Sequence, residues 1–168
     1  MKIFLVGFMG SGKTYWGRKW SQQYRLDFFD LDEIIESAQQ KTIAAIFEKD
    51  GEEYFRQVET SSLKIFSSKN NFIVACGGGA ACFNNNMQWM NENGTTVYLS
   101  AKPQTIYDRV AAEKDKRPLL EKVDKDGLLS FIEQKLKERV PFYEQAKIIL
   151  PVEELNEKAI PSFIIHNS

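Results

Sequence analysis

The sequence has little of several features that mark particular classes of protein. Only two cysteines, Cys76 and Cys82, occur among 168 residues, so a disulfide-stabilised fold is not expected. The net charge is −1, which is unlike the strongly basic surface that binds DNA or RNA. No apolar run approaches the roughly 20 residues that a membrane span needs. We therefore expect a cytoplasmic protein that binds neither nucleic acid nor membranes. A monomer is the expected oligomeric state, although none of these features reports on it.

The N-terminus also lacks the charged flank, long apolar stretch and cleavage site of a signal peptide, so we expect it to be part of the mature fold. Hydrophobic residues make up 43% and charged residues 27% of the chain, as in ordinary globular proteins. A chain of 168 residues can bury roughly 70% of its unfolded surface and suits one domain over residues 1–168.

Short apolar segments alternate with segments of helical periodicity along the chain. Strands are predicted at 2–7, 25–32, 71–76, 95–100 and 147–152. Helices are predicted at 13–24, 33–40, 42–50, 52–66, 87–93, 103–114, 128–146 and 152–165. This alternation is typical of an α/β fold with a parallel sheet of about five strands flanked by helices.

Residues 7–14, GFMGSGKT, follow the first predicted strand and fit the pattern G-x-x-x-x-G-K-[ST]. Glycines let backbone N–H groups curve around an anion without a Cβ in the way. A helix that begins near Lys13 points the positive end of its dipole at the phosphates. Lys13 can reach the outer phosphates, and the Thr14 hydroxyl can bind Mg²⁺. The segment therefore predicts a site for a nucleoside triphosphate with Mg²⁺, and a plain glycine turn is the weaker interpretation.

The phosphate loop does not by itself identify what receives the terminal phosphoryl group. The N-K-x-D pattern by which GTPases read guanine is absent. A small chain with this loop near its start is similar to nucleoside-monophosphate and small-molecule kinases, which is an analogy of fold alone. Other residues must therefore identify the acceptor.

Arginine is scarce, with six among 22 basic residues, and its fork binds carboxylate or phosphate at two points. Arg56 precedes Glu59 by three residues, so one helical face can pair them; a surface ion pair is the alternative. Arg139 comes just before Pro141, which we expect to end or kink its helix, and a solvated helix face is the alternative. Both arginines are candidates for binding an anionic substrate.

Two further arginines are candidates for the nucleotide side. Arg117 lies in KDKRPLL, a charged segment between helices, where a mobile lid over residues 111–124 would carry a cation onto the phosphates. A plain surface loop is the alternative. Arg109 could stack on a base, although a solvated helix position is as reasonable.

Asp30 and Asp32 close the second predicted strand, in FFDLDE. They are two residues apart, so on an extended chain they project to the same side, at the sheet edge where ligands of parallel α/β folds bind. One could order Mg²⁺ through water, and the other could accept a proton from an attacking hydroxyl. The alternative for Asp32 is a helix N-cap.

Gly77, Gly78 and Gly79 follow the third predicted strand at the same edge. They let the backbone approach a ligand closely and offer N–H groups to its oxygens, with a tight turn as the alternative. Cys76 before them is expected to be a small buried residue and not a nucleophile, since the only histidine, His166, is far away at the end of the chain.

Taken in order, six patterns make the sequence resemble the shikimate kinase family. They are GxxGxGKT, DLD, DGExxFRxxE, GGGA, RPLL and R-x-P-x-Y, and the match runs from about Lys2 to Ala146. The resemblance implies ATP-dependent phosphorylation of the 3-hydroxyl of shikimate, on the pathway to aromatic amino acids. It implies a P-loop fold like that of nucleoside-monophosphate kinases, with residues 34–66 as the substrate-binding part.

The resemblance also assigns roles to individual residues. Nucleotide binding is implied for Gly10, Ser11, Gly12, Lys13, Thr14, Tyr15, Arg109 and Arg117. Shikimate binding is implied for Asp32, Arg56, Gly77, Gly78, Gly79 and Arg139. Thr14 would ligate Mg²⁺, Asp30 would order its waters, Lys13 and Arg117 would stabilise phosphoryl charge, and Asp32 would meet the reacting hydroxyl.

Two alternatives stay open from the residues alone. A sugar-acid kinase similar to gluconate kinase would share the phosphate loop and an anionic acceptor, but would not need the DGExxFR and R-x-P-x-Y patterns. A nucleotide-binding domain without catalysis would tolerate the loss of Asp32 or Arg117, and both are present.

Overall fold

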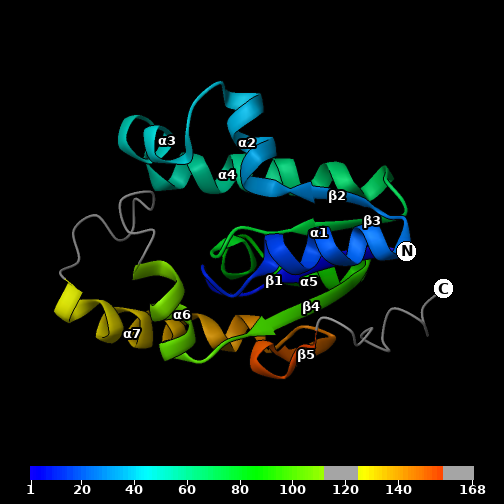
Figure 1. Cartoon of the computed structure of the whole chain (residues 1–168). Coiled ribbons are helices and arrows are strands. Elements are labelled where there is room, and N and C mark those ends of the chain that lie inside the picture. Colours follow the sequence, from blue (N-terminus) through cyan, green and yellow to red (C-terminus); the bar gives the residue numbers. More distant parts are fainter. Residues whose placement is uncertain (112–124, 157–168) are drawn as a thin grey trace.

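The strand β1 (Lys2–Val6) occupies the middle of a five-stranded sheet and is buried from Ile3 onward. The computed structural model describes residues 1–111 and 125–156 (Figure 1). The other strands are β2 (Asp27–Asp30), β3 (Phe72–Ala75), β4 (Thr95–Ser100) and β5 (Ile148–Pro151). Their order is β2-β3-β1-β4-β5 and every pairing is parallel, as the alternation of strands and helices predicts.

Helices connect and flank these strands. They are α1 (Lys13–Tyr24), α2 (Leu31–Gln39), α3 (Ile43–Lys49), α4 (Gly51–Lys64), α5 (Asn86–Asn93), α6 (Pro103–Val110) and α7 (Lys125–Tyr143). Short 3₁₀ turns lie at Ile65–Ser68, Ala80–Cys82 and Val152–Glu154. In Figure 1, α2, α3 and α4 lie together beside β2, whereas α6 and α7 lie on the side of β4.

Aromatic side chains fill much of the core around β1. The ring of Phe4 meets those of Phe66, Phe72 and Trp89 edge to face, with centroids 5.6 to 6.5 Å apart. Trp16 and Trp20 lie one turn apart on α1, so they share a helix face, and both are buried. Edge-to-face pairs of this kind add to the stability that burial supplies, so the sheet is a rigid base for the loops at its carboxyl edge.

Three predictions about elements need correction. The second strand ends at Asp30, because the Asp30 side chain caps α2 by accepting a hydrogen bond from the Asp32 amide at 3.1 Å. Asp32 therefore lies in the first helical turn, and it is neither on the strand nor the N-cap. Pro141 does not end its helix, since α7 continues for two more residues and ends at Tyr143.

The third correction concerns the helix predicted at 152–165. Of its described part, only Val152–Glu154 form a 3₁₀ turn, and residues 157–165 lie outside the described ranges. The carboxylate of Glu153 accepts hydrogen bonds from the Lys102 amide at 2.9 Å and the Thr105 hydroxyl at 2.7 Å. These bonds tie the turn to the start of α6, in place of a continuing helix.

The carboxyl ends of the central strands lead into the predicted functional segments. β1 leads to the phosphate loop, β2 leads into α2 with Asp30 at the junction, and β3 leads to Gly77–Gly79. Parallel strands bring these ends to one edge of the sheet, which is where ligands bind in such folds. The candidate site is expected there.

Candidate active site

A cavity of about 1130 Å³ lies at this edge of the sheet. Most of the predicted site residues line it, namely Gly10, Gly12, Lys13, Thr14, Tyr15, Asp30, Asp32, Arg56, Gly77, Gly78, Gly79, Arg109 and Arg139. Ser11 is buried in the phosphate loop and is not among the lining residues. Arg117 and residues 112–124 of the expected lid lie outside the described ranges.

The phosphate loop turns sharply into α1. Gly12 caps the helix with a φ of 92°, a left-handed conformation that a residue with a Cβ rarely adopts. The Lys13 ammonium group donates hydrogen bonds to the carbonyls of Gly7 at 2.8 Å and Phe8 at 2.9 Å. The lysine therefore lies across the loop, with its charge at the entrance that phosphate oxygens would occupy.

Thr14 and Asp30 meet beside the loop. The Thr14 hydroxyl donates to Oδ2 of Asp30 at 2.8 Å, and Oδ1 of the same carboxylate holds the Asp32 amide. Within the described part of the chain, no three His, Cys, Asp or Glu side chains are grouped to hold a metal. One hydroxyl and one carboxylate fit Mg²⁺, which keeps several waters and takes further oxygens from substrate phosphates.

Asp32 faces the same cavity from the first turn of α2. Burial, reinforced by the neighbouring negative charge of Asp30, raises the pKa of Asp32 to about 6, and the ammonium of Lys13 opposes that rise. The group is therefore mostly ionised at neutral pH, yet more basic than an ordinary aspartate. A carboxylate of this kind suits the acceptance of a proton from a hydroxyl.

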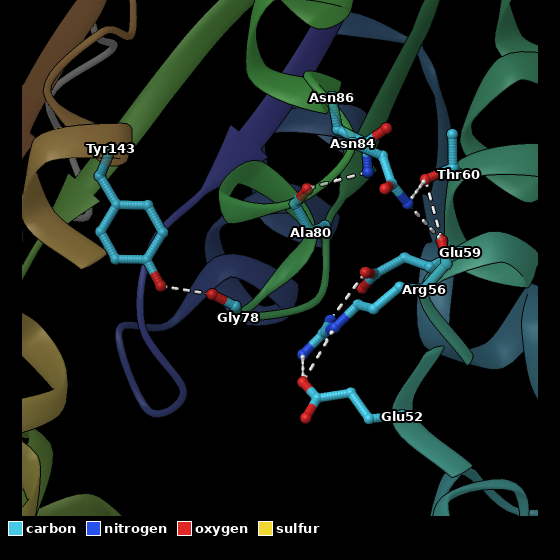
Figure 2. A network of polar contacts seen from close by, with 9 residues as sticks. All are labelled: Glu52, Arg56, Glu59, Thr60, Gly78, Ala80, Asn84, Asn86 and Tyr143. Atoms are coloured by element: carbon cyan, nitrogen blue, oxygen red, sulfur yellow. Dashed lines mark hydrogen bonds and ion pairs between the residues drawn. The ribbon is translucent and has the colours of Figure 1, made fainter. Parts of the chain in front are cut away.

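The guanidinium of Arg56 is held from two sides (Figure 2). Its Nη1 donates to Glu59 Oε2 at 2.7 Å, and both side chains are buried, so the predicted pairing is confirmed but is not a surface ion pair. Its Nη2 and Nε reach the exposed Glu52 at 3.2 and 3.3 Å. Burial raises the pKa of Glu59 to about 7, although the charge of Arg56 acts in the opposite direction.

The glycine segment fits closely against Arg56. A Cβ built on Gly79 would lie 2.6 Å from both Nη1 and Nη2 of Arg56, closer than real side chains come. On Gly78 a Cβ would lie 3.5 Å from Nη1 of Arg139. The segment therefore runs between the two arginines, and the absence of side chains lets them approach it.

Arg139 and Arg109 complete the wall of the cavity. The Arg139 guanidinium lies 5.5 Å from the centre of the Phe8 ring, a cation–π contact that connects α7 to the phosphate loop. Nη1 of Arg109 donates to the Gly10 carbonyl at 2.9 Å. Both arginines thus contact the phosphate loop, Arg139 from a half-buried position and Arg109 from an exposed one.

Sequence reasoning missed three parts of the site. Glu52 was not paired with Arg56, although the spacing of four residues on a helix is a usable signal. Ile43, Phe47 and Phe55 give the cavity an apolar wall, which alternating helical patterns alone do not reveal. Tyr143 ends the R-x-P-x-Y pattern but was given no role, because its hydrogen bond to the Gly78 carbonyl spans 65 residues of sequence.

Sequence comparison places the chain beside proteins of one activity. A family model described as shikimate kinase matches residues 9–166. A shikimate kinase of Bacteroides thetaiotaomicron is 39% identical over 158 residues, covering 94% of this chain and 90% of that protein. One of Bacteroides fragilis is 38% identical over 159 residues, covering 95% of this chain and 89% of that protein.

Solved structures give the same result. The crystal structure of shikimate kinase from Bacteroides thetaiotaomicron matches with a TM-score of 0.88 at 39% identity, over 94% of this chain and 90% of that one. Shikimate kinase from Acinetobacter baumannii in complex with shikimate matches with a TM-score of 0.87 at 33% identity, over 99% and 94%. Both matches cover more than nine-tenths of this chain.

Proposed function

This chain belongs to the shikimate kinase family, and we propose that its reaction takes place in the cavity at the carboxyl edge of the sheet. The reaction is transfer of the terminal phosphoryl group of ATP to the 3-hydroxyl of shikimate, which gives shikimate 3-phosphate. The observation that carries the proposal is that Asp32, Arg56 and Arg139 line the same cavity as Lys13. An acceptor carboxylate, two forked cations and a phosphate loop therefore face one space.

On the nucleotide side, backbone N–H groups of Gly10, Ser11 and Gly12 surround the phosphates at the positive end of α1. Lys13 exchanges the carbonyls of Gly7 and Phe8 for phosphate oxygens. Charge that builds on those oxygens in the transition state is then stabilised by a group that is already in position.

A divalent cation fits beside the loop. Thr14 and Asp30, whose side chains meet at 2.8 Å, would supply two oxygens, with Thr14 ligating the cation and Asp30 holding it through water. Bound there, Mg²⁺ supplies neutralisation of phosphate charge. Arg109 and Tyr15 border the cavity near Gly12, where a nucleoside would extend.

On the acceptor side, Arg56 and Arg139 bind the carboxylate of shikimate, since two guanidinium forks match one small carboxylate. Gly77, Gly78 and Gly79 bring their backbone against the ring hydroxyls. Asp32 accepts the proton of the 3-hydroxyl as that oxygen attacks the terminal phosphorus. The protein supplies position and charge, which is most of what phosphoryl transfer requires.

Several parts of this proposal rest on the sequence. Arg117, carried by a lid over residues 111–124, adds a second cation at the phosphates. Residues 34–66 act as the substrate-binding part of a single domain, and eight of them line the cavity. We propose a cytoplasmic monomer that binds neither nucleic acid nor membranes; among the described residues, no helix has the length and apolarity needed to cross a bilayer.

The test is an assay that couples release of ADP to an optical signal, with shikimate, gluconate or no acid added. We expect rapid ADP release when shikimate is added, and no release above background with gluconate or without an acid. Turnover with gluconate in place of shikimate would support the sugar-acid kinase alternative. Nucleotide binding without turnover of either acid would indicate a non-catalytic domain and overturn the proposal.

A further inference from the structure

Tyr143, the last residue of α7, is fully buried, and its hydroxyl donates a hydrogen bond to the carbonyl of Gly78 (Figure 2). Its ring packs against that of Tyr98 on β4, with centroids 5.1 Å apart. Burial raises the pKa of the Tyr143 phenol, so the group remains a protonated donor at neutral pH. The Tyr143 hydroxyl therefore has a fixed position and one backbone acceptor in the fold.

Gly78 belongs to the glycine segment and lies close to both the phosphate loop and Arg139. A Cβ built on it would lie 3.3 Å from the Met9 amide nitrogen of the phosphate loop, and 3.5 Å from Nη1 of Arg139. The peptide of Gly78 is thus packed between the segment that surrounds the phosphates and the arginine on α7. A small shift of this peptide would change the spacing between the two halves of the site.

Two backbone bonds and one side-chain bond shape the turn that follows the glycines, and Asn84 ties that turn to α4 by donating to the Arg56 carbonyl at 3.2 Å and the Thr60 hydroxyl at 3.0 Å. The Ala80 amide donates to the Gly77 carbonyl at 3.0 Å, and the Cys82 amide to the Gly79 carbonyl at 2.9 Å. Asn86, itself buried, donates from Nδ2 to the Ala80 carbonyl at 3.0 Å. The bonds of Asn84 thus connect this stretch to α4, whereas the bond from Tyr143 fixes Gly78 to α7.

The same helix carries Arg139 one turn before Tyr143, so both side chains lie on one face of α7. The guanidinium of Arg139 is close enough to the Tyr143 hydroxyl to act against the rise of its pKa. Tyr143 therefore contacts the glycine segment beside the arginine, and it connects the two groups that face the acid substrate.

We propose that Tyr143 is a positioning residue for the acid substrate, because its hydrogen bond to Gly78 fixes the glycine segment at a set distance from Arg139 and from the phosphate loop. Tyr143 does not itself line the cavity. It acts through Gly78 and Arg139, and the inference rests on the proposed function of these two residues in binding shikimate.

The test replaces Tyr143 by phenylalanine, which keeps the ring and removes only the hydroxyl. Tyr98→Phe is the matched control, since it removes a hydroxyl from the other ring of the same stacked pair. In Tyr143→Phe we expect KM for shikimate to rise about tenfold, the effect of one lost buried hydrogen bond, with KM for ATP within about twofold of the wild-type value. In Tyr98→Phe we expect both constants to stay within about twofold of the wild-type values.

Binding of shikimate in the presence of MgADP, measured by calorimetry, gives a second readout that does not depend on turnover. A selective loss of shikimate affinity in Tyr143→Phe supports the proposal. Unchanged shikimate constants overturn it, and so does an equal rise in both KM values or loss of the folded state, which would assign Tyr143 to stability alone. If the wild-type protein neither binds nor phosphorylates shikimate, the proposed function fails, and this inference fails with it.

Discussion

Glu59 holds Arg56 through a 2.7 Å bond between Oε2 and Nη1 in which neither side chain is open to solvent. Glu52 approaches the same guanidinium at 3.2 Å from the surface, with 57% of its side chain exposed. One arginine thus has a buried and an exposed carboxylate partner on a single helix. Removing each carboxylate in turn therefore compares a buried with an exposed ion pair to the same guanidinium.

The first prediction compares Glu59→Ala with Glu52→Ala. Loss of Glu59 removes the buried partner of the guanidinium and leaves it only the exposed Glu52, so we expect the free energy of unfolding to fall by about 3 kcal/mol. Loss of Glu52 removes an exposed ion pair and should change it by less than about 1 kcal/mol. Urea denaturation monitored by tryptophan fluorescence measures both. Equal effects of the two substitutions would mean that Glu59 does not hold Arg56 in solution.

The second prediction concerns the carboxylate of the substrate. Arg139→Ala should weaken shikimate binding by roughly 2–5 kcal/mol, because one cation of a desolvated pair is lost. Lys135→Ala is the matched control, since Lys135 lies one turn earlier on α7 and pairs with Glu138 in solvent. Its shikimate affinity should equal that of the wild type. An Arg139→Ala protein with unchanged affinity would remove Arg139 from the carboxylate site.

The third prediction uses the contact between Gly79 and Arg56. The backbone of Gly79 has a φ of −96° and a ψ of −13°, which an alanine adopts without strain. The added Cβ would nevertheless lie 2.6 Å from two nitrogens of Arg56. Gly79→Ala should therefore displace the guanidinium and raise KM for shikimate about tenfold or more, a loss of about 1.4 kcal/mol or more.

Gly127→Ala is the control for this steric argument, since a Cβ on Gly127 meets nothing within 4 Å. Replacement of glycine by alanine inside a helix should stabilise α7 by about 1 kcal/mol and leave KM unchanged. Initial rates over a range of shikimate concentrations separate the two variants. A Gly79→Ala protein with the wild-type KM would show that Arg56 can move aside at no cost to binding.

Local patterns in the sequence were sufficient for most of the fold. The apolar run at Lys2–Val6 and the glycines after it predict a buried strand and a phosphate loop, because strand, turn and helix preferences act over few residues. The pairing of Arg56 with Glu59 was predictable for the same reason, since three residues of helix bring them together. Contacts between residues a few positions apart can therefore be predicted from their spacing in the sequence.

Longer contacts were not predictable in this way. The sequence favoured Asp32 over Asp30 as a possible helix cap, and which of two nearby aspartates caps α2 depends on where β2 leaves the sheet. The bond between Tyr143 and Gly78 depends on the packing of α7 beside the glycine segment, which neither sequence window contains. The convergence of Asp32, Arg56 and Arg139 on one cavity likewise follows from tertiary packing, and the sequence could only suggest it by resemblance.

The fourth prediction is a dependence of activity on pH that follows from Asp32. Its pKa is raised to about 6, and only the ionised carboxylate accepts a proton from the substrate hydroxyl. We expect kcat/KM for shikimate to fall about tenfold for each pH unit below about 6, at saturating ATP. A profile measured from pH 5 to 8 tests this. A constant rate down to pH 5 would exclude Asp32 as the proton acceptor.

The same raised pKa has a consequence for stability, with a definite sign. The folded state holds the Asp32 proton more tightly than the unfolded state, where the pKa is near 3.8, so the stability that Asp32 contributes is present below about pH 4 and is lost as pH rises through about 6. At pH 7.5 the loss is about 3 kcal/mol, from a shift of about two units. Asp32→Asn, which is neutral at every pH, should therefore unfold at higher urea than the wild type at pH 7.5 and at similar urea at pH 4, while its phosphoryl transfer is nearly abolished. Wild-type and variant proteins of equal stability at pH 7.5 would show that burial does not penalise the Asp32 charge, and would leave the acid limb of the activity profile without its cause.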